Sequence, residues 1–267
     1  MGIVNVTPDS FSDGGRFMAP ENAISHGRQL LEEGADLIDL GAESTRPGSQ
    51  PVPADEQVKR LAPVVEALAS IGAVLSIDTQ SAVVAHAMLG RGAHLINDIS
   101  ALGDPDMAAV VAQHGAGLVL MHMQGTPATM QLAPHYRDVV DEVAAFLAQR
   151  SAKARAAGIA DECIVLDPGI GFGKTLEHNL ALLGSLTTLV RLGHPVLVGV
   201  SRKGFLGRLT GEDSPQQRFE ASLAAGVLAA WQGVHLLRVH DVAATRRALA
   251  LSDAVTQQRA SAKVEPR

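Results

Sequence analysis

Three absences restrict the class of this protein. A single cysteine, Cys163, stands among the 267 residues, so no disulfide can form within the chain. No apolar run approaches the ~20 residues that are needed to span a bilayer, and no signal peptide is visible at the start of the sequence. We therefore expect a cytoplasmic protein with no membrane partner.

Basic charge is also scarce. Lysine and arginine number 22 against 28 aspartates and glutamates, which gives a formal net charge of −6 at pH 7. This balance argues against nucleic acid or an anionic membrane surface as the main partner, but it is compatible with a local basic pocket for a small anion. Hydrophobic residues make up 46% of the chain and supply ample material for a core.

The stretch from 163 to 175, CIVLDPGIGFGKT, shows the pattern on which the rest of the chain is built. It starts with a short, β-branched apolar run that is typical of a strand buried on both faces. The run ends in Asp167. In the following turn Gly169, Gly171 and Gly173 permit backbone conformations that side chains would forbid. A helical pattern begins at about residue 177.

The same order of strand, polar ending and helix occurs eight times along the chain. Strands that alternate with helices predict parallel pairing of the strands. We expect strands at residues 2–6, 36–41, 73–78, 94–99, 117–122, 163–167, 195–200 and 235–239. We expect helices at 21–33, 54–71, 82–91, 105–114, 137–157, 177–192, 215–231 and from 242, with a polar tail that frays from about 257.

Eight such units in about 250 residues fit a single (β/α)₈ TIM barrel with its site at the C-terminal ends of the strands. This barrel would span residues 1–267 as one domain. The alternative is an open, doubly wound sheet. We favour the barrel because polar residues follow every predicted strand, whereas the switch point of an open sheet would concentrate them on a few strands.

Buried charges at the ends of strands are costly unless they are paired, so a full ring of them predicts a site rather than a structural feature. The polar residues of this ring are Asn5, Thr45, Arg46, Asp78, Asn97, His122, Asp167, Ser201, Arg202, Lys203, Arg238 and His240.

The ring contains two chemical groups. Asp78, Asn97 and Asp167 offer carboxylates and an amide, which suit a flat heterocycle with several N–H donors and a carbonyl. Lys203 can donate to a ring carbonyl or a ring nitrogen. The second group carries cations and hydroxyls that suit a phosphate or diphosphate, with Asn5 as a candidate oxygen ligand for Mg²⁺. Its members are Arg46, Ser201, Arg238 and His240, together with Asn5 and Thr45.

Three other motifs favour different functions less strongly. Residues 169–175 look like a phosphate-binding P-loop, but Pro168 stands where the first glycine of that motif belongs. Lys203 could form a Schiff base, which would leave the diphosphate-like residues unexplained. His122 and His240 could bind zinc, but no close spacing of histidine, cysteine or glutamate supports a zinc site.

The strand ends resemble those of the dihydropteroate synthase family over nearly the whole chain. The motifs are MGIVNVTPDSFSDGG at 1–15, GAESTRPG at 41–48, SIDT at 76–79, INDI at 96–99, LDPGIGFGK at 166–174, SRKGF at 201–205 and RVHDV at 238–242. Each motif alone is moderately specific. Their occurrence in order on successive strands is highly specific.

This resemblance implies an enzyme of folate synthesis, an alkyl-group transferase. It would join 6-hydroxymethyl-7,8-dihydropterin diphosphate to p-aminobenzoate, which sulfonamides mimic, and would release 7,8-dihydropteroate and diphosphate. It implies a homodimer formed through the last helices, and it suggests Asp78, Asp167, Lys203 and Arg238 as the catalytic residues.

The resemblance also assigns binding roles. The pterin would lie among Asp78, Asn97, Met121, Asp167, Phe172, Gly199, Lys203 and Arg238. The diphosphate would lie near Asn5, Thr45, Arg46, Ser201, Arg238 and His240, with Mg²⁺ at Asn5. The p-aminobenzoate pocket and its lid would include Thr7, Asp9, Ser10, Phe11, Pro47, Phe172, Lys203 and Gly204.

Residues 7–15 are expected to form a loop that closes over the second substrate. Mg²⁺ and the cations would stabilise the departing diphosphate. A dissociative alkyl transfer would follow, in which the aniline nitrogen attacks an electron-poor pterin methylene. Gly204 stands where similar proteins often have serine, and the chain starts directly at its first strand.

Two rival functions share part of this pattern. A pterin-binding methyltransferase domain would use Asp78, Asn97 and Asp167 but has no need of the diphosphate group. A non-catalytic pterin-binding barrel would need neither the cations nor turnover. The presence of Ser201, Lys203, Arg238 and His240 together with Arg46 speaks against both.

Overall fold

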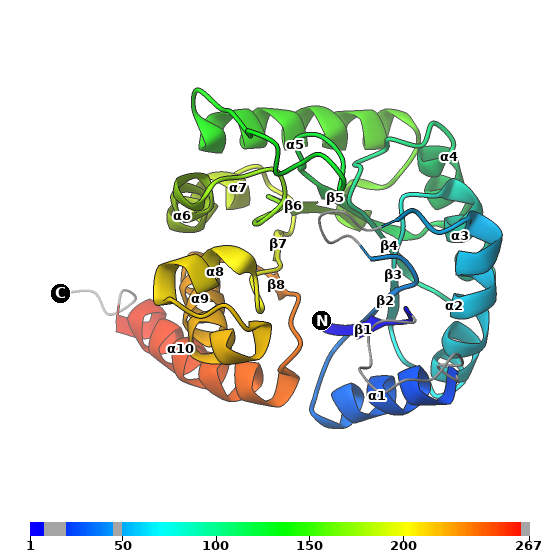
Figure 1. Ribbon diagram of the computed structural model, residues 1–267, viewed down its shortest axis with the longest axis horizontal. Helices are drawn as coiled ribbons and strands as arrows, with labels where there is room; N and C mark the ends of the chain where they lie inside the picture. Colours follow the sequence, from blue (N-terminus) through cyan, green and yellow to red (C-terminus); the bar gives the residue numbers. More distant parts are fainter. Residues whose placement is uncertain (8–19, 45–49, 263–267) are drawn as a thin grey trace.

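The structure, a computed structural model, describes residues 1–7, 20–44 and 50–262, with side chains up to 258. Eight strands stand at its centre, with helices arranged around them (Figure 1). The strands are β1 (Gly2–Asn5), β2 (Ile38–Gly41), β3 (Leu75–Asp78), β4 (Leu95–Asp98), β5 (Gly117–Met121), β6 (Ile164–Asp167), β7 (Leu197–Val198) and β8 (Leu236–Leu237).

The strands form a closed ring. Strands β1 to β6 pair in sequence order in one parallel sheet, and β7 pairs with β8, also in parallel. Two isolated bridges join these sheets, one between Leu166 and Val196 and one between Gly2 and Val239. The predicted (β/α)₈ barrel is therefore confirmed, and the open-sheet alternative is excluded.

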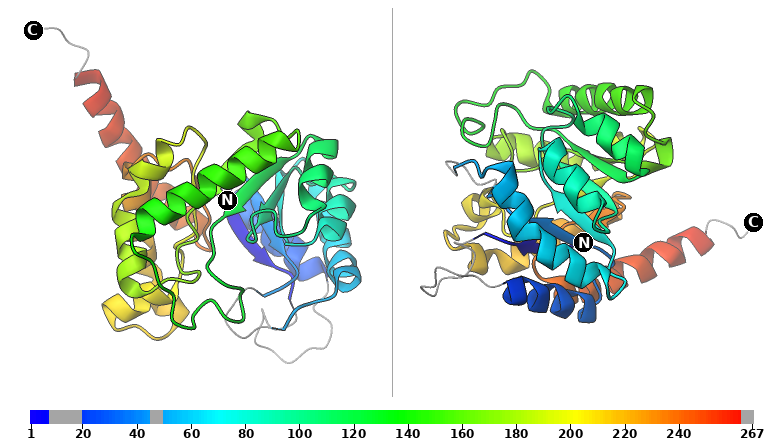
Figure 2. Two further views of the ribbon diagram at one scale, coloured as in Figure 1. Left: turned by 90° about the horizontal axis from the view of Figure 1, so that it is seen from above. Right: turned by 90° about the vertical axis from the view of Figure 1, so that its right-hand side faces the viewer.

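Ten α-helices lie outside the ring in the described part of the chain (Figure 1). They are α1 (Pro20–Glu32), α2 (Ala54–Ala69), α3 (Ala82–Leu89), α4 (Met107–His114), α5 (Val139–Ala156), α6 (Leu176–Gly184), α7 (Leu186–Val190), α8 (Gly204–Thr210), α9 (Phe219–Trp231) and α10 (Val242–Ala262). The end of α10 projects from the barrel (Figure 2). The segment from 257 that we expected to fray is helical as far as Ala262. None of the helices described is long and apolar enough to cross a membrane.

Two helical details differ from the sequence prediction. The helix expected over 177–192 is divided at Ser185, where the backbone φ of −126° is not helical. Helix α8 was not expected, because two glycines in seven residues disfavour a helix. One of them, Gly207, packs so closely that a Cβ would lie 2.2 Å from the carbonyl oxygen of Glu212. Tertiary packing therefore selects glycine there.

Residues that alternate along the strands separate two cores. One set, including Leu40, Ile77 and Leu118, packs between the strands and the helices. The other set lines the lower interior of the barrel as a small apolar cluster, which we call the floor. Its buried members are Met1, Leu95, Val119 and Leu197, with Leu37, Val165 and Leu236 packed against them. Residues further along the same strands form the site.

Candidate active site

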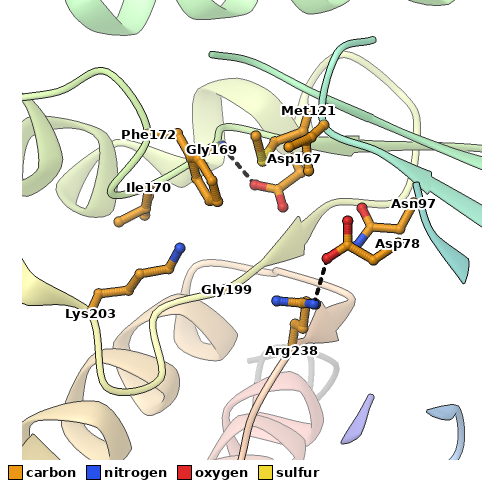
Figure 3. A pocket seen from close by; sticks show the side chains of 11 residues that line it. Asp78, Asn97, Met121, Asp167, Gly169, Ile170, Phe172, Gly199, Lys203 and Arg238 are labelled. Atoms are coloured by element: carbon orange, nitrogen blue, oxygen red, sulfur yellow. Dashed lines mark hydrogen bonds and ion pairs between the residues drawn. The ribbon is translucent and has the colours of Figure 1, made fainter. Parts of the chain in front are cut away.

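A pocket opens above the floor, at the C-terminal ends of the strands (Figure 3). All eight residues that the resemblance assigned to the pterin line this pocket, and the structure therefore brings them together. Three further residues, Ile99, Gly169 and Ile170, were missed. The lining residues are Asp78, Asn97, Ile99, Met121, Asp167, Gly169, Ile170, Phe172, Gly199, Lys203 and Arg238.

Arg238, which follows β8, connects two carboxylates beneath and beside the pocket. Its Nε donates to Asp39 Oδ2 at 2.6 Å, and its Nη2 donates to Asp78 Oδ2 at 2.9 Å. Asp39, in the middle of β2, is fully buried and was not predicted as a site residue. The available signal was a carboxylate inside an otherwise apolar strand, which requires a partner when it is buried.

The carboxyl groups of Asp78 and Asp167 are held partly protonated near neutral pH. Burial raises the pKa of Asp78 to about 7, although Arg238 acts in the opposite direction. Burial also raises the pKa of Asp167 to about 6, opposed by the backbone N–H of Gly169, which donates to Asp167 Oδ1 at 2.7 Å. Carboxyl groups of this kind can accept hydrogen bonds or donate a proton at physiological pH.

Asn97, at the end of β4, presents a free acceptor. Its side chain is 3% exposed, and its Nδ2 donates to Asp39 Oδ2 at 3.2 Å. Its Oδ1 is buried without a hydrogen-bond partner among the described residues. Because an unpaired buried acceptor is costly, this oxygen indicates a ligand that supplies an N–H or O–H group.

Lys203 and Phe172 face each other across the pocket (Figure 3). The Lys203 Nζ lies 3.9 Å from the centroid of the Phe172 ring, close enough for a cation–π interaction. Burial, and after it the charge of Arg238, lower the pKa of Lys203 to about 8, although Asp167 and Asp78 act in the opposite direction. The ammonium group is thus available as a donor at neutral pH.

Lys174 is turned into its own glycine-rich loop. Its Nζ is buried and donates to the carbonyl oxygens of Gly169 (3.0 Å), Phe172 (2.9 Å) and His122 (3.3 Å). A P-loop lysine would instead reach outward to a phosphate. The P-loop interpretation is therefore excluded, and Lys174 fixes the loop that carries Phe172.

The His122 ring provides a further hydrogen-bond partner for Lys174. Its Nδ1 lies 3.0 Å from Lys174 Nζ. Burial and then the Lys174 charge lower the pKa of His122 to about 3, so the ring is neutral and accepts from the ammonium group. No three His, Cys, Asp or Glu side chains of residues 1–7, 20–44 and 50–258 are grouped so that they could hold a metal ion. The zinc interpretation therefore has no support among these residues.

The residues predicted to bind diphosphate are described in part. Ser201 Oγ lies 3.0 Å from His240 Nδ1, and burial lowers the pKa of His240 to about 4. Arg202 is ion-paired with Asp241 at 2.7 Å.

The other predicted site residues lie at the ends of elements or outside the described chain. Gly204 begins α8. Asn5 ends β1, and Thr7 follows it. Six predicted residues lie outside the described part of the chain: Asp9, Ser10, Phe11, Thr45, Arg46 and Pro47.

The sequence and the fold were compared with known proteins. A family model described as pterin binding enzyme matches residues 1–240. A dihydropteroate synthase of Neisseria meningitidis serogroup B is 47% identical over 96% of this chain and 92% of its own length. Three solved structures are also similar. A Yersinia pestis dihydropteroate synthase in a sulfonamide drug complex has a TM-score of 0.91 and 46% identity, covering 96% of this chain and 93% of its own.

The other two are of Xanthomonas albilineans dihydropteroate synthase. The structure with 4-aminobenzoic acid has a TM-score of 0.90 and 50% identity, and the structure with 7,8-dihydropteroate has a TM-score of 0.87 and 47% identity. Each covers 96% of this chain and 92% of its own. The residues matched by the family model extend through β1 to β8 and include every residue that lines the pocket. The chain therefore belongs to the pterin-binding enzyme family, among its dihydropteroate synthases.

Proposed function

We propose that the chain condenses 6-hydroxymethyl-7,8-dihydropterin diphosphate with p-aminobenzoate to give 7,8-dihydropteroate and diphosphate. The observation that carries this proposal is the Asn97 Oδ1, which has no hydrogen-bond partner in the described part of the chain and lies in a pocket that also holds Asp78, Asp167 and Lys203. Such a pocket offers acceptors to the N–H groups of a pterin and a donor to its carbonyl. The related structures with 4-aminobenzoic acid and 7,8-dihydropteroate support the choice of substrates.

The reaction that we infer breaks the bond between the pterin methylene and the diphosphate oxygen, and diphosphate leaves with the bonding electrons. The carboxylate forms of Asp78 and Asp167 stabilise the positive charge that develops on the pterin. The uncharged amine of p-aminobenzoate then attacks the methylene, forms the new C–N bond and loses one proton. Catalysis comes from positioning and electrostatics, without a covalent bond to the enzyme.

We further propose that Mg²⁺ assists the departure of diphosphate. The Asn5 side chain lies at the C-terminal end of β1 and has no hydrogen-bond partner among the described residues, so its amide oxygen is available. One neutral oxygen suits Mg²⁺, which keeps several waters and takes its remaining ligands from substrate phosphate. The bound ion would supply charge stabilisation, while Ser201 and His240 would contact the anion.

We propose a cytoplasmic homodimer that forms through α9 and α10. These helices pack against each other and expose large apolar side chains: Leu228 and Trp231 on α9, and Leu251 and Val255 on α10. Large exposed apolar side chains on two helices that pack together are typical of a contact surface. The substitution Leu251→Asp should shift the mass in solution from dimer to monomer. Val83→Asp, at an exposed position on α3, should leave the mass unchanged.

The proposed function is tested by measuring diphosphate release from the pterin diphosphate in the presence of Mg²⁺. We expect release together with formation of 7,8-dihydropteroate when p-aminobenzoate is present. Slow release without p-aminobenzoate would favour the dissociative order of steps. Mass spectrometry of the enzyme after turnover should find no pterin adduct, and a stable adduct at Lys203 would contradict the proposed mechanism.

The same measurement separates the two rival functions. A pterin-binding methyltransferase domain or a non-catalytic pterin-binding barrel would bind the pterin without releasing diphosphate. Tight pterin binding with no release in the presence of both Mg²⁺ and p-aminobenzoate would therefore overturn the synthase assignment.

A further inference from the structure

Asp39 lies beneath the pocket and does not line it. Its carboxylate is fully buried and is held by three side chains from three other strand regions. Ser76 Oγ donates to Oδ1 at 2.5 Å, Asn97 Nδ2 donates to Oδ2 at 3.2 Å, and Arg238 Nε donates to Oδ2 at 2.6 Å. Two of these partners, Asn97 and Arg238, do line the pocket.

We propose that Asp39 is a positioning residue, which fixes the orientation of the Asn97 amide and of the Arg238 guanidinium and thereby determines how the pocket recognises the pterin. This inference rests on the proposed function, because it takes the pterin as the ligand. It assigns to Asp39 no contact with the substrate.

The orientation of the Asn97 amide follows from hydrogen-bond chemistry. An ionised carboxylate only accepts hydrogen bonds, so the amide must turn its NH₂ group toward Asp39. The Asn97 Oδ1 is then left as the atom without a partner in the described structure. A ligand must therefore bring a donor to this point. If Asp39 were neutral and could donate, the amide could rotate and present NH₂ to the ligand instead.

Hydrogen bonds to two carboxylates also fix the orientation of the Arg238 guanidinium. Its Nε bond to Asp39 and its Nη2 bond to Asp78 engage two different nitrogens. These two contacts leave little rotational freedom to the planar group. The remaining guanidinium surface lies at the wall of the pocket (Figure 3).

The charge of Asp39 also raises the pKa of Asp78. The charged groups that face Asp78 are Arg238, Asp39, Lys203 and Glu43. Arg238 and Lys203 lower the pKa of Asp78, whereas Asp39 and Glu43 raise it, in addition to the larger effect of burial. Removal of the Asp39 charge should therefore lower the pKa of Asp78 and leave Arg238 to pair with Asp78 alone.

The test uses the substitution Asp39→Asn in the full-length protein, with Asp98→Asn as the matched control. Asp98 is also fully buried and also accepts three hydrogen bonds, from Ser100 N, Ser100 Oγ and Leu102 N, but it has no bond to a pocket side chain. Both variants lose a buried carboxylate, so a loss of stability alone should be similar in the two.

We expect Asp39→Asn to weaken pterin binding by roughly tenfold or more, the size of one charge-assisted hydrogen bond. The KM for p-aminobenzoate should change by less than about twofold, because Asp39 acts on the pterin residues alone. The limb of the pH–rate profile that reports Asp78 should move to lower pH. Asp98→Asn should leave pterin affinity and this limb unchanged.

Ser76→Ala provides a milder variant if Asp39→Asn does not fold. It removes one of the three bonds to Asp39 and keeps the charge, so pterin affinity should fall by roughly two- to fivefold without movement of the pH limb. Equal effects of Asp39→Asn and Asp98→Asn on pterin affinity would overturn the inference, as would an unmoved limb in Asp39→Asn. If the wild-type protein does not catalyse condensation, the proposed function itself has failed, and these comparisons then concern pterin binding alone.

Discussion

Two successive layers inside the barrel differ in chemistry although the same strands build them. The floor layer contains Met1, Leu95, Val119 and Leu197, which pack only against other apolar side chains. Leu37, Leu95 and Leu236 also belong to the floor or pack against it. Two residues after each of them stand Asp39, Asn97 and Arg238, which form the next layer and are joined by hydrogen bonds at 2.6 to 3.2 Å. The floor is held by removal of apolar surface from water, whereas the upper layer persists because its charges satisfy one another.

Because different forces hold the two layers, substitutions in them should have different effects. Truncation in the floor removes contacts and creates a cavity, which lowers stability without a change of charge. Truncation in the upper layer leaves a buried charge without its partner, which affects stability and function together.

Arg238→Ala should have the largest effect. It would leave Asp39 and Asp78 close together without their shared cation. We expect kcat/KM to fall by roughly a thousandfold, since a charge at the wall of the proposed pterin pocket is lost, and the free energy of unfolding to fall by about 3–5 kcal/mol. Steady-state kinetics and urea denaturation measure the two effects. Retention of most of the activity would show that Arg238 has no part in catalysis.

Leu197→Ala tests the floor. The side chain is fully buried and belongs to the floor cluster, so its truncation should lower the free energy of unfolding by about 2–5 kcal/mol. Turnover per folded molecule should change little, because no polar contact of the upper layer is altered. A large loss of kcat in molecules that remain folded would show that the two layers are not independent.

Asp78→Asn should change how stability depends on pH. The raised pKa of about 7, against an ordinary value of 3.8, means that the native carboxyl keeps its proton where the unfolded one has lost it. Its contribution is fully present below pH 3.8 and is lost as the pH rises to about 7, with a slope of up to about 1.4 kcal/mol per pH unit. Denaturation of the wild type and the variant between pH 4 and 7.5 should show a flatter curve for the variant.

Lys174→Met should change the pH dependence of stability above pH 7, whereas Asp78→Asn changes it below pH 7. Burial lowers the pKa of Lys174 from 10.5 to about 7. Its contribution to stability is therefore present above pH 10.5 and is lost as the pH falls toward 7. The variant should flatten the stability curve between pH 7 and 10 and should weaken binding at the pocket by roughly tenfold, because the Gly169 and Phe172 carbonyls lose their donor. Lys153→Met is the control, since Lys153 donates to Leu102 O outside the pocket.

Gly204→Ser should have the smallest effect. A Cβ at this position would meet no atom within 4 Å, and the residue begins α8 with an ordinary backbone conformation. Stability should change by less than about 0.5 kcal/mol, as for other surface substitutions. A hydroxyl that helps to hold the carboxylate of p-aminobenzoate would lower its KM by a few-fold, and an unchanged KM would show that the backbone N–H is sufficient.

The strands of the barrel and the residues of the pocket could be predicted because both depend on local patterns. Apolar runs such as Gly117–Met121 have the length and composition of buried parallel strands. In a closed parallel barrel, the residue after each strand must face the same end of the molecule. Asp78, Asn97, Asp167, Lys203 and Arg238 therefore meet in one pocket, as the pattern predicts. The other three pterin residues, Met121, Phe172 and Gly199, were predicted only from the family resemblance, and they line the same pocket.

The number of units, the parallel order of the strands and the end at which polar side chains gather all follow from the amino-acid pattern. Which of these side chains pair with one another depends on the folded arrangement of the chain. Asp39 joins Asn97 and Arg238 across separations of 58 and 199 residues, and Lys174 turns inward to its own loop instead of outward to an anion. Pairing of buried polar groups depends on distances of a few ångströms between residues that are remote in sequence, and no local pattern contains that information.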